Sequence, residues 1–275
     1  MRAHWTLDDI DWSQLDRSVV TEELLSAVKT AALVEANSAD YVTYLHNVFR
    51  DDSEFCAAAS VWGAEEAQHG AALGRWATLV DPDFDFTAAM ARFRDGYRLP
   101  LESGESVRGS LAGELLARCV VESGTCSYYA ALRDASEEPV LRAVCHRISQ
   151  DEARHYQLFH RHYQRYPRLS WWRRLRIAIG RVVETGDDEL GYAWFSAVES
   201  HEPGNDGYLP KVHAARYQAI ATGFYQERHV RTLLHMITTA LGCRAGSRWS
   251  RWLGALGWWW LSRSNQACDS AAASA

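Results

Sequence analysis

The sequence predicts an all-α protein whose centre is a bundle of four long helices. Two observations support this prediction. Apolar and small residues recur at helical spacing through four long segments, and no segment shows strand-like alternation of useful length. In addition, a Glu-x-x-His motif occurs twice, on the second and fourth segments, while the first and third segments each carry a lone glutamate on the same stripe.

The first helical hairpin follows a lead-in of residues 1–20, which is predicted to be irregular or in short helical turns. Thr21 offers a helix cap, and the first helix is expected to run from there to about residue 50, with Glu35 on its apolar stripe. A turn at residues 51–53 leads into the second helix, which extends to about Val80 and carries Glu66 and His69.

The second hairpin begins after a long crossover at residues 81–107, which contains two glycines and two prolines and is predicted to be a connection. The third helix, residues 107–134, carries Glu122. The fourth helix, residues 136–166, carries Glu152 and His155. Residues 21–166 are therefore predicted to form the bundle.

Beyond the bundle, the sequence predicts accessory helices and a tail. Residues 167–241 contain two further helical stretches, at about 170–200 and 209–241, which are expected to pack on the bundle. Residues 242–275 are rich in tryptophan and end in small residues, a composition that predicts a partly disordered tail.

Composition narrows the class of protein. The net charge of −6 argues against a nucleic-acid-binding surface. The sequence contains no run of about 18 apolar residues, so no membrane-spanning helix is predicted. None of the six cysteines forms a Cys-x-x-Cys pair, and several lie on apolar helix faces, as reduced buried cysteines do. These features predict a cytoplasmic protein.

The spacing of the acidic residues predicts a shared site. Glu35 and Glu66 are 31 residues apart, and Glu122 and Glu152 are 30 residues apart. In each hairpin the two carboxylates therefore lie at about the same height, roughly 20 Å from the turn. Two hairpins with matched ligand heights and one long crossover describe a ferritin-like bundle, whose site takes a Glu from each of two helices and Glu-x-x-His from each of the others.

The charge of this cluster predicts metal ions. Burying four carboxylates without a cation is costly, whereas two Fe(II) ions balance their charge. Mixed carboxylate and imidazole ligands suit iron, and manganese also fits. The predicted ligands are Glu35, Glu66, His69, Glu122, Glu152 and His155. Glu65 and Asp151, which directly precede two ligands, are expected to accept the free N–H of the histidine on the opposite helix.

Three motifs resemble the soluble acyl-carrier-protein desaturase branch of the ferritin-like superfamily. Residues 62–70, Trp-Gly-Ala-Glu-Glu-Ala-Gln-His-Gly, are similar to that branch's Trp-Thr-Ala-Glu-Glu-Asn-Arg-His-Gly. Residues 151–155, Asp-Glu-Ala-Arg-His, are similar to its Asp-Glu-Lys-Arg-His, and Glu122-Ser-Gly-Thr125 matches a Glu-x-x-Thr. The resemblance covers about residues 20–166; the segment beyond shows none.

The resemblance implies a non-haem di-iron, O₂-dependent oxidoreductase acting on an unactivated C–H bond of an acyl chain or a similar small organic substrate. Thr125 then either helps deliver a proton to oxygen or is a core threonine bonded to its own helix. Tyr129 either relays an electron or packs in the core. Desaturation leads among the reactions, followed by hydroxylation and N-oxygenation. His46 is interpreted as a buried structural histidine rather than an extra ligand.

Two features of the sequence predict binding partners: no electron-transfer module is recognisable, and one segment is rich in arginine. No reductase or ferredoxin-like module is recognisable, so an external electron donor such as a ferredoxin is expected. Residues 161–181 interleave arginines with Trp171 and Trp172, a pattern that suits an acyl carrier protein, a membrane surface or an ordinary solvated face. A homodimer is also compatible with the sequence. Two other functions remain open: ferritin-type iron oxidation and storage, and a binding bundle with structural metal.

Overall fold

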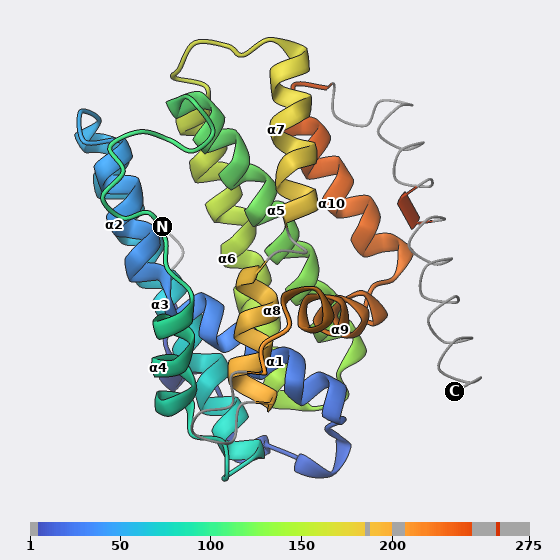
Figure 1. The fold of residues 1–275 in the computed structure, drawn as a ribbon. Coiled ribbons are helices and arrows are strands. Elements are labelled where there is room, and N and C mark those ends of the chain that lie inside the picture. The colour runs from blue at the N-terminus through green and yellow to red at the C-terminus, as the bar shows by residue number, and fades with distance from the viewer. Residues whose placement is uncertain (1–4, 185–187, 200–206, 244–256, 259–275) are drawn as a thin grey trace.

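The computed structural model describes residues 5–184, 188–199, 207–243 and 257–258, and regular structure within these ranges is helical (Figure 1). The prediction of an all-α protein is confirmed for this part of the chain. The lead-in forms three short 3₁₀ turns, η1 (Leu7–Asp9), η2 (Trp12–Gln14) and η3 (Arg17–Val19). Aspartate side chains cap two of these turns, at Ser13 and Ser18.

The first predicted helix is two helices, and the prediction of one continuous helix to residue 50 is wrong. Helix α1 (Glu22–Ala36) ends at Asn37, whose φ of −86° and ψ of 10° leave the helical region, and α2 (Ser38–Val48) begins directly after it. Asparagine competes with helix hydrogen bonding through its own side chain and favours such breaks. Helix α3 (Ser53–Val80) follows, capped by Asp52.

The crossover contains a helix that the sequence pattern did not predict. Helix α4 (Phe86–Gly96) begins at Asp85, whose side chain accepts a hydrogen bond from the Ala88 amide. Its buried residues Ala89, Met90 and Phe93 pack into the core, and this packing stabilises a helix within a stretch rich in glycine and proline.

The second hairpin consists of α5 (Leu111–Ala135) and α6 (Pro139–Tyr163), close to the predicted ranges. Glu138 fixes the start of α6. Its buried carboxylate accepts hydrogen bonds from the amides of Val140 and Leu141, and also from the Trp76 indole of α3 at 2.7 Å. The start of α6 is thus tied to the C-terminal part of α3.

The C-terminal stretches are more broken than predicted. Residues 170–200 form α7 (Trp171–Glu184), α8 (Asp188–Trp194) and the π-helical turn η4 (Phe195–Glu199), while residues 209–241 form α9 (Pro210–Gly223) and α10 (Glu227–Ala240). Helices α7 and α10 pack on α5, and α8 packs on α1 (Figure 1). The expected tail at residues 242–275 lies largely outside the described residues.

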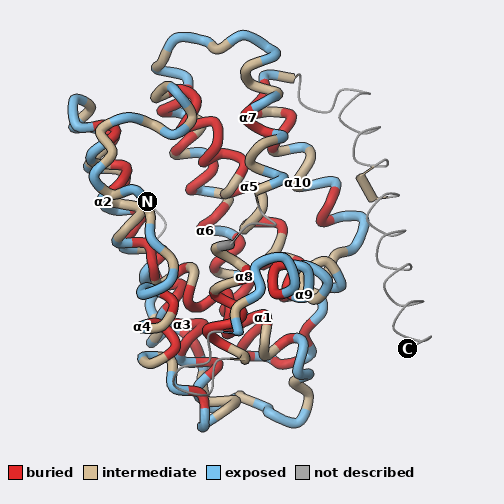
Figure 2. The backbone as a smooth tube through the Cα atoms, in the orientation of Figure 1, coloured by how far each residue is buried: buried red, intermediate tan, exposed pale blue. Residues whose placement is uncertain are grey.

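The core runs along the inner faces of α1, α3, α5 and α6, where buried residues concentrate (Figure 2). Trp76, Phe93, Leu132 and Ile148 are among its fully buried side chains. None of the helices in the described ranges combines the length and apolarity needed to cross a membrane.

Candidate metal centre

Six buried side chains from α1, α3, α5 and α6 meet in the middle of the bundle. Helix α1 contributes Glu35 and α5 contributes Glu122, while α3 contributes Glu66 and His69 and α6 contributes Glu152 and His155. Within each Glu-x-x-His pair the side chains lie one turn apart on the same helix face. The structure therefore brings together all six residues that the sequence predicts as ligands.

The six residues form two overlapping groups, each able to hold a metal ion. One group contains Glu35 and His69, the other contains Glu122 and His155, and both contain Glu66 and Glu152. Within each group the ligand atoms lie within 4.8 Å of one another. The two shared carboxylates thus lie between two adjacent positions, each completed by one further carboxylate and one imidazole.

Four of the buried ligand atoms lack hydrogen-bond partners within the described structure. These atoms are the Nδ1 atoms of His69 and His155, Oε2 of Glu122 and Oε1 of Glu152. His155 Nδ1 lies 3.0 Å from Glu66 Oε1, and His69 Nδ1 lies 3.3 Å from Glu152 Oε1, yet neither contact has hydrogen-bond geometry. Buried polar atoms are rarely left unsatisfied, so their convergence here fits cation binding.

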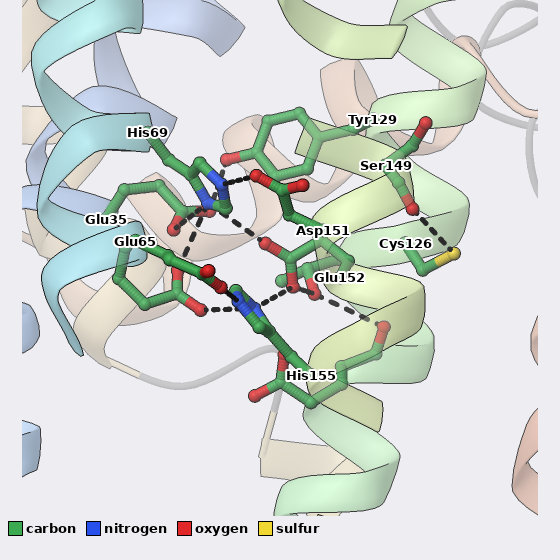
Figure 3. Close-up of polar contacts among 12 residues, drawn as sticks. Glu35, Glu65, His69, Cys126, Tyr129, Ser149, Asp151, Glu152 and His155 are labelled. Atoms are coloured by element: carbon green, nitrogen blue, oxygen red, sulfur yellow. Dashed lines mark hydrogen bonds and ion pairs between the residues drawn. The ribbon is translucent and has the colours of Figure 1, made fainter. Parts of the chain in front are cut away.

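Two carboxylates behind the cluster orient the imidazole rings (Figure 3). Asp151 Oδ2 lies 3.0 Å from His69 Nε2, and Glu65 Oε2 lies 2.6 Å from His155 Nε2. Each carboxylate comes from the helix opposite its histidine, as the sequence analysis expected. An N–H donated from Nε2 leaves the Nδ1 lone pair facing the cluster, which is the tautomer that a metal ligand needs.

Trp5 is a further contact of the cluster that the sequence analysis missed. Its indole N–H donates a hydrogen bond to Asp151 Oδ2 at 2.7 Å, and its ring stacks on the His69 ring with centroids 6.2 Å apart. Trp5 lies in the lead-in, 146 residues from Asp151, where no periodic pattern indicates a role.

Tyr129 and Thr125 on α5 also touch the cluster. The buried Tyr129 hydroxyl donates a hydrogen bond to Glu35. The Thr125 hydroxyl lies 2.5 Å from Glu152 Oε2 and also lies near the carbonyls of Val121 and Glu122 in its own helix. Thr125 therefore contacts the cluster while keeping the helical contacts expected of a core threonine.

His46 lies elsewhere. Its Nε2 contacts the Cys56 carbonyl at 3.0 Å and the Ser60 hydroxyl at 3.1 Å, and it does not belong to either of the two ligand groups. This placement agrees with a structural histidine.

Burial and mutual repulsion perturb the titration of the cluster. Burial raises the pKa of the Glu35 and Glu122 carboxyls well above their ordinary range, and the nearby Glu66 carboxylate adds to the shift at Glu35. Burial opposes protonation of the two imidazoles, but their carboxylate partners raise the pKa of both His69 and His155 well above its ordinary value. Burial also disfavours the ionised forms of Glu66 and Glu152, but their contacts with the two histidines help to hold the pKa of both carboxyls below its ordinary value. In the metal-free fold, protons are therefore favoured on Glu35, Glu122 and the two imidazoles.

No protein-family model matches this sequence, and a search of curated proteins finds no match. The functional interpretation therefore depends on the geometry and chemistry of the site itself.

Proposed function

We propose that this protein is a non-haem di-iron, O₂-dependent oxidoreductase with a ferritin-like bundle. One observation carries the proposal: two adjacent ligand groups share Glu66 and Glu152, and four of their buried atoms have no other partner in the described structure. Shared carboxylates between two such groups are typical of dinuclear carboxylate sites in helix bundles.

The donor set fits two divalent ions. Glu35 and His69 would hold one ion, Glu122 and His155 the other, and Glu66 and Glu152 would contact both. Four carboxylates then balance two ions of charge +2, in place of the protons that the raised pKa values hold in the metal-free protein. Oxygen and imidazole ligands suit iron or manganese, and no thiolate takes part.

Bound as Fe(II), the two ions would give O₂ two of the four electrons that reduce it to water, and oxidation of the substrate C–H bond would supply the other two, while the external donor would restore the Fe(II) state. The protein contributes orientation and protons. Asp151 and Glu65 hold the two imidazoles so that each Nδ1 faces the four clustered carboxylates. Thr125 holds a hydroxyl proton against Glu152 Oε2, and its proposed role is to supply that proton during the reaction.

The reaction and the partners are part of the proposal. The motifs at residues 62–70 and 151–155 favour desaturase-like chemistry on a small organic substrate, with an external electron donor such as a ferredoxin. Trp172 on α7 is 76% exposed, which leaves the arginine- and tryptophan-rich segment 161–181 accessible to a carrier protein, a donor or an anionic surface.

The direct test is the metal content of purified protein. Wild-type protein is expected to bind about two irons per chain, and the Glu66→Ala, Glu152→Ala double variant is expected to lose them, because each substitution removes a ligand from both positions. Glu54→Ala with Glu137→Ala, two exposed carboxylates, is the matched control. Circular dichroism of each variant separates metal loss from unfolding.

A double variant that folds and retains both irons would refute the site. Reduced, iron-loaded protein exposed to O₂ is expected to develop a transient visible absorbance. The storage alternative predicts instead a large cage by light scattering and many irons per chain.

A further inference from the structure

A cavity of about 490 Å³ lies beside the candidate metal centre, between α2, the connection before α5, α5 itself, the end of α7 and the start of α8. This volume falls within the range of small-molecule sites. Three tyrosines and several aliphatic side chains line it, together with six charged residues: Arg108, Arg118, Arg181, Glu114, Glu184 and Glu189.

Most of these charges are already paired. Arg108 donates two hydrogen bonds to Glu184, at 2.6 and 2.5 Å, and Arg181 lies 3.4 Å from the same carboxylate. Glu189 accepts a hydrogen bond from the Tyr41 hydroxyl at 2.5 Å. These pairs form the wall of the cavity but leave little binding capacity for a ligand.

Arg118 is paired less tightly. It is only 9% exposed. Within the described residues its guanidinium has one long ion pair, to Glu114, and no hydrogen bond. The ion pair joins Arg118 Nε to Glu114 Oε1 at 3.6 Å, which is longer than a hydrogen bond, and Arg118 Cζ lies 4.6 Å from the Tyr41 ring centroid. Glu114 instead accepts hydrogen bonds from Tyr44 and Ser106. A buried guanidinium has five N–H donors to satisfy, and a carboxylate matches its fork.

Arg118 also links the cavity to the metal centre. It lies four residues before Glu122 on α5, and these two buried residues share a helix face. Its Cζ lies 6.0 Å from the Trp62 ring centroid, and Trp62 packs edge-on against the His155 ring at 6.5 Å. Val121, the neighbour of Glu122, lines the cavity itself. A molecule held by Arg118 therefore lies close to the ligands on the Glu122 and His155 side.

We propose that this cavity is the substrate site and that Arg118 binds the carboxylate of a small polar organic acid. Its role as a substrate site rests on the proposed oxidoreductase function, whereas the binding of a carboxylate does not. Arginine, glutamate and tyrosine side chains around the cavity oppose burial of a long alkyl chain, because methylene groups offer no hydrogen-bond partner to the polar atoms that face the cavity. The inference therefore narrows the substrate class from acyl chains in general to small carboxylic acids.

The test compares benzoate with its neutral isostere benzamide, by saturation-transfer NMR and calorimetry on metal-free and Mn(II)-loaded protein. Wild type is expected to prefer benzoate. Arg118→Gln is expected to weaken benzoate binding roughly tenfold to a hundredfold, as loss of a charged hydrogen-bond partner does. Arg118→Lys keeps the positive charge without the planar guanidinium, so its affinity for benzoate is expected to lie between those of wild type and Arg118→Gln. Arg161→Gln, on an exposed face of α6, is the control.

Three results would overturn the proposal. The first is equal binding of benzoate and benzamide by wild type, and the second is benzoate binding by folded Arg118→Gln that equals that of wild type. The third is an affinity for fatty acids that rises from octanoate to dodecanoate and is unchanged in Arg118→Gln. If Arg118→Gln fails to fold, Arg118→Lys and the wild-type comparison still decide. Metal content is measured in parallel. If the protein prefers benzoate but binds no iron, the carboxylate site is supported and the oxidoreductase function is refuted. If it binds two irons but does not prefer benzoate, the metal site is supported and the carboxylate site is refuted.

Discussion

His69 Nε2 lies 3.0 Å from Asp151 Oδ2, and this contact turns His69 Nδ1 towards Glu35, Glu66 and Glu152. The pair joins α3 to α6 across the bundle, and Asp151 has no direct place in either ligand group. Its contribution to metal binding is therefore expected to act through the orientation and basicity of the ring.

Asp151→Asn is expected to lower metal affinity by roughly 10–100-fold, because the amide weakens the polarisation of the His69 ring and can present an N–H to it. Competition with a chelator measures the affinity. Trp5→Phe, which removes the indole donor to Asp151 and keeps a smaller aromatic ring, is expected to have a smaller effect. Equal affinities for wild type and Asp151→Asn would show that the contact does not support the site.

Gly70→Ala is expected to destabilise the protein by about 1–3 kcal/mol and to weaken metal binding. A Cβ at residue 70 would lie 2.5 Å from the backbone nitrogen of Ala36, so α1 and α3 must separate beside Glu35 and His69. Urea unfolding and iron content measure the two effects.

Gly124→Ala is the matched control, because a Cβ there would meet no atom within 4 Å apart from its chain neighbours and the adjoining backbone of its own helix. It should raise stability by roughly 0.5–1 kcal/mol, as removal of a helix-interior glycine does. Similar losses of stability and iron content in Gly70→Ala and Gly124→Ala would refute the proposed effect of close packing between α1 and α3 at Gly70.

The stability gained from metal is expected to grow with pH. The pKa values of Glu35, Glu122, His69 and His155 are raised in the metal-free fold, so their protonated forms stabilise it. That contribution is lost as pH rises through the folded pKa values, whereas bound ions replace the protons. Thermal unfolding of metal-free and Mn(II)-loaded protein across the neutral range checks this, and a difference in melting temperature that shrinks with rising pH would contradict it.

Thr125→Val is expected to keep two irons per chain but to slow O₂-dependent turnover by roughly tenfold or more, because it removes the hydroxyl proton beside Glu152. Thr125→Ser keeps the hydroxyl and should retain most of the rate. Stopped-flow absorbance of the reduced, loaded protein follows the reaction. A Thr125→Val variant as fast as wild type would assign Thr125 to packing alone.

Much of the candidate site could be predicted because its ligands follow helical geometry. Glu66 and His69 lie one turn apart, as do Glu152 and His155, and equal spacing within two hairpins sets the height of every carboxylate. The break at Asn37 did not disturb this register, since Glu35 lies just before it and α3 packs against both α1 and α2.

Other features have no periodic signal in the sequence. Helix α4 depends on buried contacts of Ala89 and Phe93, which outweigh the glycines and prolines around it. Trp5 reaches Asp151 across 146 residues, and such long-range contacts leave no local pattern.

The sequence by itself determined the helical class and the six-residue cluster, because short-range spacing on a helix specifies which side chains share a face. Only the tertiary structure decided how the two ligand groups share Glu66 and Glu152, and where Arg118 lies. The cavity around Arg118 is built from four helices and a connection distant along the chain, so its charge pairing depends on how these elements pack rather than on any one of them.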